Sequence, residues 1–302
     1  MRRGENTGSR RMNRNRFARQ ILMFGDEGQK KIERQKVAVV GAGGLGSHVC
    51  QALAYTGVRN LGVIDDDRLD ETNMNREAGG FPPDVGRLKV DVIRDHVLRI
   101  APETEVVPIA KNVRTREAME YLMSRSVIFG CVDHDGPRLV LTDLAAAYSV
   151  TLIDLATEIF PETAARKFDF GGRVVVARPG DYCLFCAHQL DRERAKEDIE
   201  TPEVRAERRK HGYGLGTDAP APAVFALNGI IANLAVIEFL VMVTGIRDPA
   251  RRLTYKGTRG AVTDTIDVRK PDCYTCGCLC GQREEANVWR YLLPPLNEYD
   301  AI

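Results

Sequence analysis

The sequence predicts an α/β protein with a Rossmann-like, doubly wound and mostly parallel sheet, on three observations. Short apolar runs of strand length alternate with helical patterns over about 120 residues. A glycine-rich turn at Gly41–Gly46 joins the first apolar run to a helical pattern. An acidic residue, Asp65, ends the next apolar run. This combination is typical of parallel sheets that bind nucleotides.

The first half of the chain supports this class element by element. Residues 12–34 have apolar side chains at near-helical spacing and predict an amphipathic helix. Four more helices and five strands are then expected in alternation, each strand short and apolar. The strands are 36–40, 60–64, 105–109, 127–131 and 152–155, and the helices are 44–56, 85–100, 114–123 and 137–148.

The pattern changes after Thr157. Residues 168–177 have strand character, and 222–244 predict a long apolar helix. That helix contains Asn228, Asn233 and Glu238, so a buried helix is expected rather than a membrane span. Residues 252–256 and 261–268 predict a terminal antiparallel pair with a turn between them. The parallel sheet should therefore carry a C-terminal antiparallel extension.

The domain organisation follows from these patterns and from charge. Residues 1–14 are expected to form a flexible basic tail, since residues 1–19 hold seven Arg and one Glu. Residues 15–282 should form a single domain, with a nucleotide-binding half at 15–157 and a crossover half at 158–282. Residues 283–302 are assigned to a C-terminal tail. Of the 20 residues at 191–210, 14 are charged, which indicates an exposed crossover segment. That segment could gate access for a partner or be a solvated loop.

Composition narrows the partners and the compartment. A formal net charge of +1 gives no reason to expect nucleic-acid binding, and no membrane partner is expected. The chain has eight Cys, and no secretory signal pattern is seen near its start. These features favour metal binding in a reducing, cytoplasmic compartment over a disulfide framework.

The glycine turn predicts an adenine nucleotide. Gly41 allows a tight turn, Gly43 lets the backbone approach a phosphate, and Gly46 lets helix and strand pack closely. Asp65 follows Gly41 by 24 residues, where a ribose-binding acid is expected. This pattern alone does not separate NAD, FAD and ATP, and a glycine turn that binds nothing is the structural alternative.

Later residues favour ATP. A triphosphate needs cations beside its β- and γ-phosphates and an acid for Mg²⁺. Asn73, Arg76 and Lys89 follow Asp65 within 25 residues, and Asp133 comes at the end of a later strand. Any one of these residues could be a solvated surface charge, but together they form an ordered set.

At this point the chain closely resembles the ubiquitin-activating (E1-like) enzymes, above all the bacterial adenylyltransferases that activate sulfur carriers in molybdopterin and thiamine biosynthesis. The resemblance covers about residues 15–282 and rests on specific motifs. They are Arg16-Phe17-Ala18-Arg19-Gln20-Ile21, Gly41-Ala42-Gly43-Gly44-Leu45-Gly46, Asp65-Asp66-Asp67, Asn73-Met74-Asn75-Arg76, Gly86-Arg87-Leu88-Lys89 and Cys131-Val132-Asp133.

The resemblance implies ATP-dependent adenylation of the C-terminal glycine carboxylate of a small ubiquitin-like or sulfur-carrier protein, or of a short peptide. It implies that Asp65 binds ribose, with Asp67 beside it, and that Asp133 lies near Mg²⁺. It implies that the nucleotide is held by the glycine loop (Gly41, Gly43, Gly44, Gly46) and by Asn73, Arg76 and Lys89. It also implies a homodimer in which Arg19 reaches the partner's ATP site, as an arginine finger does.

The cysteines form two C-x₂-C pairs, Cys183/Cys186 and Cys273/Cys276, separated by 86 residues. Four thiolates in two such pairs predict a closed tetrahedral Zn²⁺ site, and the resembling family holds structural zinc in this way. A redox dithiol and free buried cysteines are the alternatives. Cys278 and Cys280 lie close enough in sequence to offer other ligand pairs.

One departure from the family concerns the thioester step. Residues 187–224 contain no Cys, so a thioester is not expected on this chain unless Cys278 or Cys280 serves. The alternative functions are an NAD- or FAD-binding oxidoreductase, for which His134 is the nearest candidate residue, and a catalytically silent binding scaffold.

Overall fold

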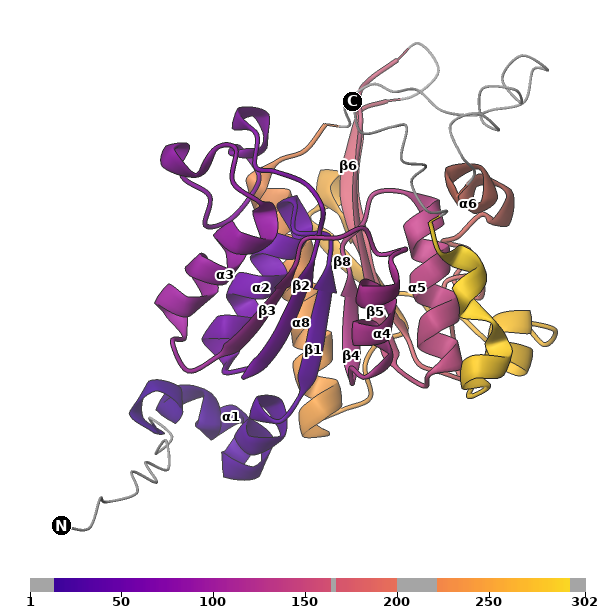
Figure 1. Ribbon diagram of the computed structural model, residues 1–302, viewed down its shortest axis with the longest axis horizontal. Coiled ribbons are helices and arrows are strands. Elements are labelled where there is room, and N and C mark those ends of the chain that lie inside the picture. Colours follow the sequence, from indigo (N-terminus) through magenta and orange to yellow (C-terminus); the bar gives the residue numbers. More distant parts are fainter. Residues whose placement is uncertain (1–13, 164–166, 200–221, 294–302) are drawn as a thin grey trace.

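A computed structural model describes residues 14–163, 167–199 and 222–293 of the chain. An eight-stranded sheet with the order β3-β2-β1-β4-β5-β6-β7-β8 forms its centre (Figure 1). The strands from β3 to β5 in this order are parallel, and β6, β7 and β8 are antiparallel. The predicted mixed α/β class, with its antiparallel C-terminal extension, is therefore confirmed.

The elements follow the predicted alternation. The strands are β1 Lys36–Val40, β2 Asn60–Ile64, β3 Glu105–Ile109, β4 Val127–Gly130, β5 Thr151–Phe160, β6 Asp169–Ala177, β7 Arg252–Lys256 and β8 Ala261–Asp264. The helices are α1 Arg14–Glu33, α2 Gly44–Thr56, α3 Lys89–Ile100, α4 Arg116–Met123, α5 Asp135–Ala147, α6 Arg192–Ile199 and α8 Phe225–Thr244. Short turns are η1 Glu71–Asn73, η2 Pro82–Asp84, η3 Gly257–Arg259, η4 Thr275–Leu279, η5 Arg283–Ala286 and η6 Val288–Tyr291.

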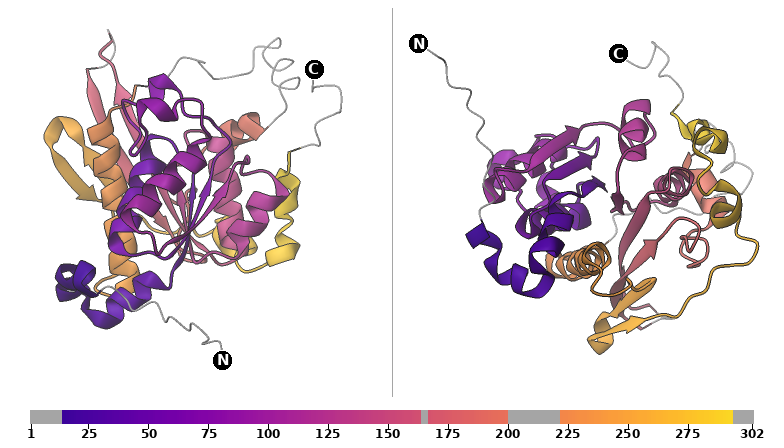
Figure 2. Two further views of the ribbon diagram at one scale, coloured as in Figure 1. Left: turned by 60° about the vertical axis from the view of Figure 1, so that its left-hand side comes forward. Right: turned by 90° about the horizontal axis from the view of Figure 1, so that it is seen from below.

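Helices cover both faces of the sheet (Figure 2). Alternate side chains of β1 point to opposite faces, so Ala38 and Val40 join one core, and Val37 and Val39 the other. The first core also contains α4, α5 and both cysteine pairs, whereas the second contains residues of α2, α3 and α8. Two buried cores on one continuous sheet make a rigid base for the loops at its edge.

The helix α8 is long and apolar enough to cross a membrane by length and composition, a test that buried core helices also pass. In this structure 56% of its most apolar window is buried. Leu227, Ile231 and Phe239 belong to the core that α2 and β1 share. The helix thus packs against the sheet, as its amide and acidic residues indicated.

Three boundaries differ from the predictions by four residues or more. The helix expected from Val85 begins at Lys89 instead, because Gly86 has a left-handed φ of 89° and Leu88 forms a bridge with Arg68. β5 extends to Phe160, because antiparallel pairing with β6 supports the added residues. β8 ends at Asp264, after which the Asp267 side chain bonds Arg252.

Parts of the predicted flanking segments lie outside the described residues. These are 1–13 of the basic tail, 200–210 of the charged segment and 294–302 of the C-terminal tail. Within the remainder of that segment, α6 packs against α5, where the Asp198 carboxylate accepts hydrogen bonds from the backbone N–H groups of Asp135 and Gly136. Residues 283–291, assigned to a tail, form η5 and η6 and bury Val288 and Tyr291.

Candidate nucleotide site and cysteine cluster

The glycine loop lies where the strand order reverses. β1 has β2 on one side and β4 on the other, so the chain leaves these strands in opposite directions, and sheets of this class bind ligands in the crevice at the carboxyl ends of such strands. Gly41 has a φ of 91°, and a Cβ there would collide with the Cys131 carbonyl oxygen. The turns after β1 and β4 therefore touch, which requires glycine at position 41.

Gly43 differs from Gly44 and Gly46 because there is space for a side chain at its position. A Cβ at Gly46 would collide with the Gly41 carbonyl oxygen, and one at Gly44 with the Asn228 side chain. A Cβ at Gly43 would meet only Glu77 Oε1, at an ordinary 3.7 Å. Gly43 is also the N-cap of α2 and supplies no side-chain cap, which leaves the amides of the first turn available to an anion.

Asp65 is fixed against this loop. Its Oδ2 accepts a hydrogen bond from the Ala42 N–H at 2.6 Å, and its Oδ1 accepts one from the Asp67 N–H at 2.8 Å. Burial raises the pKa of Asp65, although these two hydrogen bonds and the charge of Lys89 oppose the shift. The carboxylate is thus held at the end of β2, as expected of a ribose-binding acid.

The segment after β2 carries Asn73 and Arg76. Asn73 is buried and its Oδ1 accepts a hydrogen bond from the Asp70 N–H at 3.2 Å, so its side chain caps η1. The Arg76 guanidinium donates to the Thr72 carbonyl oxygen at 2.7 Å and is partly exposed. This turn positions Arg76 at the edge of the site, while Asn73 shapes the turn itself.

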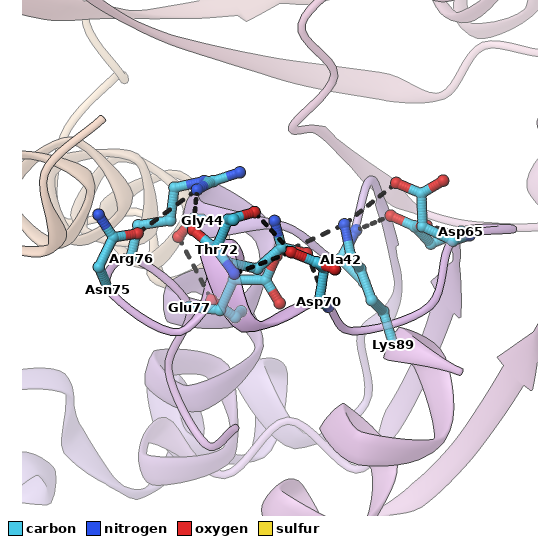
Figure 3. A network of polar contacts seen from close by, with 12 residues as sticks. Ala42, Gly44, Asp65, Asp70, Thr72, Asn75, Arg76, Glu77 and Lys89 are labelled. Atoms are coloured by element: carbon cyan, nitrogen blue, oxygen red, sulfur yellow. Dashed lines mark hydrogen bonds and ion pairs between the residues drawn. The ribbon is translucent and has the colours of Figure 1, made fainter. Parts of the chain in front are cut away.

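Lys89 is buried at the first position of α3. Its ammonium nitrogen lies 3.0 Å from Asp67 Oδ2 and 3.5 Å from Glu77 Oε1. Burial alone would lower the pKa of Lys89, but the charges of Glu77, Asp65 and Asp67 outweigh it and raise this pKa. In Figure 3 the lysine lies beside Ala42, between Asp65 and the turn that contains Asp70. The structure thus brings Lys89, Asp65 and the glycine loop together.

Glu77 belongs to this group and was not predicted from sequence. It directly follows Arg76, which was the only available signal, but a loop glutamate is usually exposed. Here its side chain is buried, and burial raises its pKa to about 7 although Lys89 opposes the shift. The site therefore contains a carboxyl group that can change its charge near neutral pH.

Two predicted residues, Asp133 and Arg19, form no hydrogen bond or ion pair with this group in the described part of the chain. Asp133 follows β4 with its side chain 91% exposed, and His134 Nε2 is 3.7 Å from one of its oxygens. Arg19 is exposed on α1, a helix that lies beside the edge of the sheet where β1 begins (Figure 1). The neighbouring Gln20 donates to the carbonyl oxygen of Thr56, at the far end of α2 from Gly43. Within one chain, Arg19 and the glycine loop thus lie at opposite edges of the sheet.

The two cysteine pairs meet in a buried cluster. The Cys183–Cys273 sulfur distance is 3.4 Å, and the Cys183–Cys186 and Cys186–Cys276 distances are both 3.8 Å. All four sulfurs lie within 4.8 Å of one another. Sulfurs about 2.3 Å from a tetrahedral zinc lie about 3.8 Å apart, so this donor set fits zinc. Cys278 is exposed and outside the cluster.

Comparisons with known proteins agree with this arrangement. A model of the ThiF family matches residues 17–278. The molybdopterin-synthase adenylyltransferase of Escherichia coli (strain K12) is 27% identical over 87% of this chain and 96% of its own length. The adenylyltransferase and sulfurtransferase uba4 of Aspergillus terreus is 33% identical, but over 46% of this chain and 29% of its own length.

A solved structure shows the same fold. The crystal structure of Escherichia coli MccB with ATP superposes with a TM-score of 0.67 at 21% identity, covering 88% of this chain and 75% of that one. The family match spans both the glycine loop and the cysteine cluster. The chain therefore belongs to the ThiF family of E1-like adenylyltransferases.

Proposed function

We propose that this protein uses ATP to adenylate the C-terminal carboxylate of a small ubiquitin-like or sulfur-carrier protein and releases pyrophosphate. The observation that carries the proposal is the buried Lys89 ammonium beside Asp65 and the uncapped start of α2. The relative from Escherichia coli is itself named an adenylyltransferase. Family membership favours ATP over the NAD or FAD of an oxidoreductase.

Each candidate residue would contact a different part of the nucleotide, according to its charge. Asp65 would accept hydrogen bonds from the ribose, and the first amides of α2 beside Gly43 would bind phosphate oxygens. Lys89 and Arg76 would neutralise the β- and γ-phosphates, which favours departure of pyrophosphate as the carboxylate attacks the α-phosphorus. Asp133 offers oxygen ligands at the same edge and fits Mg²⁺, which would supply further neutralisation when bound.

The product of this step is an acyl-adenylate that leaves for a separate acceptor. Formation of an enzyme-bound thioester from it would require a Cys thiolate, and residues 187–224 contain no Cys. Cys278, which is exposed, and Cys280, which is partly exposed, are the alternative nucleophiles on this chain. We therefore expect no enzyme-bound thioester, which a Cys278→Ser variant would test.

We further propose a homodimer in which Arg19 completes the partner's site. On α8 the apolar Ile230 and Ile237 side chains are 39% and 43% exposed, seven residues apart on one face. Burial of such a face by a second copy is favourable. An exposed Arg19 at the far edge of its own chain is available to another chain, where it would add positive charge to the triphosphate.

We also assign zinc to the cluster of Cys183, Cys186, Cys273 and Cys276. It would join the segment after β6 to the segment after β8, which are distant in sequence. A chain that holds its cysteines as thiols suits a reducing compartment, and we propose that this compartment is the cytoplasm.

Transfer of labelled AMP tests the proposed function. The protein is incubated with ATP labelled at the α-phosphate and with small ubiquitin-fold proteins that end in Gly-Gly. We expect one of them to acquire AMP at its C-terminus, detected by mass spectrometry, and its variant without the last glycine to acquire none. If no ubiquitin-fold protein or short peptide acquires AMP, while NAD or FAD binds tightly, the proposal is wrong.

A further inference from the structure

Glu77 is a buried acid for which the proposed reaction has no use. Only 6% of Glu77 is exposed to solvent. Its Oε1 has no hydrogen-bond partner among the described residues. The nearest cationic atom is the Lys89 ammonium nitrogen, whose 3.5 Å separation is too long for a strong hydrogen bond. Glu77 thus has an ion-pair partner, but its buried Oε1 accepts no hydrogen bond, which costs free energy and needs an explanation.

The same oxygen, Glu77 Oε1, faces the phosphate region. It lies 3.7 Å from the position of a Cβ on Gly43, the residue that opens α2 and leaves its first amides uncapped. Figure 3 shows Glu77 in the same network as Gly44 and Lys89. A polyphosphate seated on the start of α2 would therefore lie close to a carboxylate, and two negative groups would repel each other.

The charges around Glu77 come from several elements. Lys89 on α3 and Arg76 on the same turn are cationic and favour the ionised carboxylate. Asp65 at the end of β2 is anionic and, together with burial, favours the protonated form. On α2 the buried His48 has its pKa lowered by burial, and it adds no positive charge at neutral pH. The net result is a pKa of about 7 for Glu77, so modest changes of charge decide its protonation.

We propose that Glu77 positions Lys89 in the free protein and takes up a proton from solvent when a nucleoside triphosphate binds beside it. The carboxylate becomes a neutral carboxylic acid, which removes the repulsion and provides an O–H donor for a phosphate oxygen. Lys89 then loses one of its two anionic partners and is freed to contact the triphosphate. This inference rests on the proposed function for the location of the nucleotide.

Calorimetry detects such proton uptake directly. The non-hydrolysable analogue α,β-methylene ATP with Mg²⁺ is titrated into the full-length protein at pH 8, in HEPES and in Tris. A phosphate monoester has its second pKa at about 6, so the analogue is already ionised at pH 8. We expect the wild type to take up close to one proton, and its Kd to rise about tenfold per pH unit above pH 7.

Two variants separate this effect from other causes. Glu77→Gln should bind the analogue without proton uptake and with a Kd that does not change with pH. Glu71→Gln, which alters an exposed glutamate of the neighbouring η1, should behave like the wild type. If Glu77 had a purely structural role, its substitution would change the affinity for the analogue. The wild type would then take up no proton when it binds the analogue.

The outcomes distinguish the inference from the proposed function. Binding by the wild type without proton uptake would overturn the inference and leave adenylation intact. Absence of nucleotide binding by the folded wild type would overturn both. The wild-type proton count decides the question even if Glu77→Gln does not fold.

Discussion

Lys89 remains charged in a buried position because carboxylates surround it. Asp67 and Glu77 lie within 3.5 Å of its ammonium nitrogen, and Asp65 adds its charge from the end of β2. In the free protein three carboxylates thus surround this one ammonium group and more than offset its positive charge.

Stability should depend on pH through Glu77. Its pKa is about 7 in the folded protein and 4.5 when exposed, so the folded state binds more protons between these values. The stabilising contribution is complete below pH 4.5 and decreases as pH rises towards 7. We expect thermal unfolding to show Glu77→Gln gaining stability relative to the wild type from pH 5 to pH 8. A constant difference in Tm would contradict this cause.

Sequence identified Lys89 and Asp65 but not Glu77, for a physical reason. Asp65 ends an apolar strand and Lys89 completes an ordered set of phosphate-binding types, so both give local signals. The burial of Glu77 depends on how the turn after β2 folds back over the start of α2, which no local pattern specifies. The capping role of Asn73 is equally invisible, because it depends on the η1 geometry.

At the scale of elements, two contacts join distant segments to α5 and β6. One is the cysteine cluster. The other is Asp143 on α5, fully buried, which accepts hydrogen bonds from Thr275, Arg290 and the Tyr291 hydroxyl. The spacing of the cysteines predicted the first contact. The second was not predicted, because the sequence gives no sign that Asp143 and Arg290 meet.

Zinc should be a structural part of the molecule. We expect about one zinc per chain by elemental analysis, with loss of the metal and a lower Tm for Cys186→Ser, because three ligands hold zinc less tightly than four. Cys278→Ser is the matched control, since Cys278 is exposed and outside the cluster. Equal zinc content in the two variants would show that the cluster is not the site.

The Asp143 contact should matter for stability. Asp143→Ala would leave the Arg290 guanidinium and the buried hydroxyls of Thr275 and Tyr291 without this acceptor. Removing one partner of a buried ion pair costs about 3–5 kcal/mol, and the lower end applies here because Arg290 is 35% exposed. Urea unfolding measures this loss. Asp248→Ala, which removes a 91% exposed partner of Arg178, should cost less than about 1 kcal/mol.

For the whole molecule, sequence predicted the sheet class and the antiparallel extension, because strand and helix periodicities are strong local signals. It placed one helix start wrongly at Val85, since a left-handed Gly86 and a bridge at Leu88 interrupt the pattern. The adjacency of β1 and β4, which creates the crevice, arises from strand order rather than from either strand alone. The structure therefore adds most to the sequence predictions at the ends of elements and in the loops.

Assembly is testable at this scale. If α8 forms the dimer interface, Ile237→Glu should convert the dimer to a monomer in light scattering, because a carboxylate would be buried without a partner. Ile266→Glu, at a 95% exposed position after β8, should leave the assembly unchanged. A dimer that persists in the Ile237→Glu variant would place the interface elsewhere.

The central claim is that Lys89 and its neighbours hold ATP for adenylation. The most direct test is ATP–pyrophosphate exchange in the presence of a ubiquitin-fold protein that ends in Gly-Gly. We predict exchange that depends on that protein and decreases about 10²-fold in Lys89→Met, as removal of a single charge-stabilising group commonly causes. Lys31→Met, at an exposed lysine of α1, should exchange normally. Exchange at the wild-type rate in folded Lys89→Met would contradict the account.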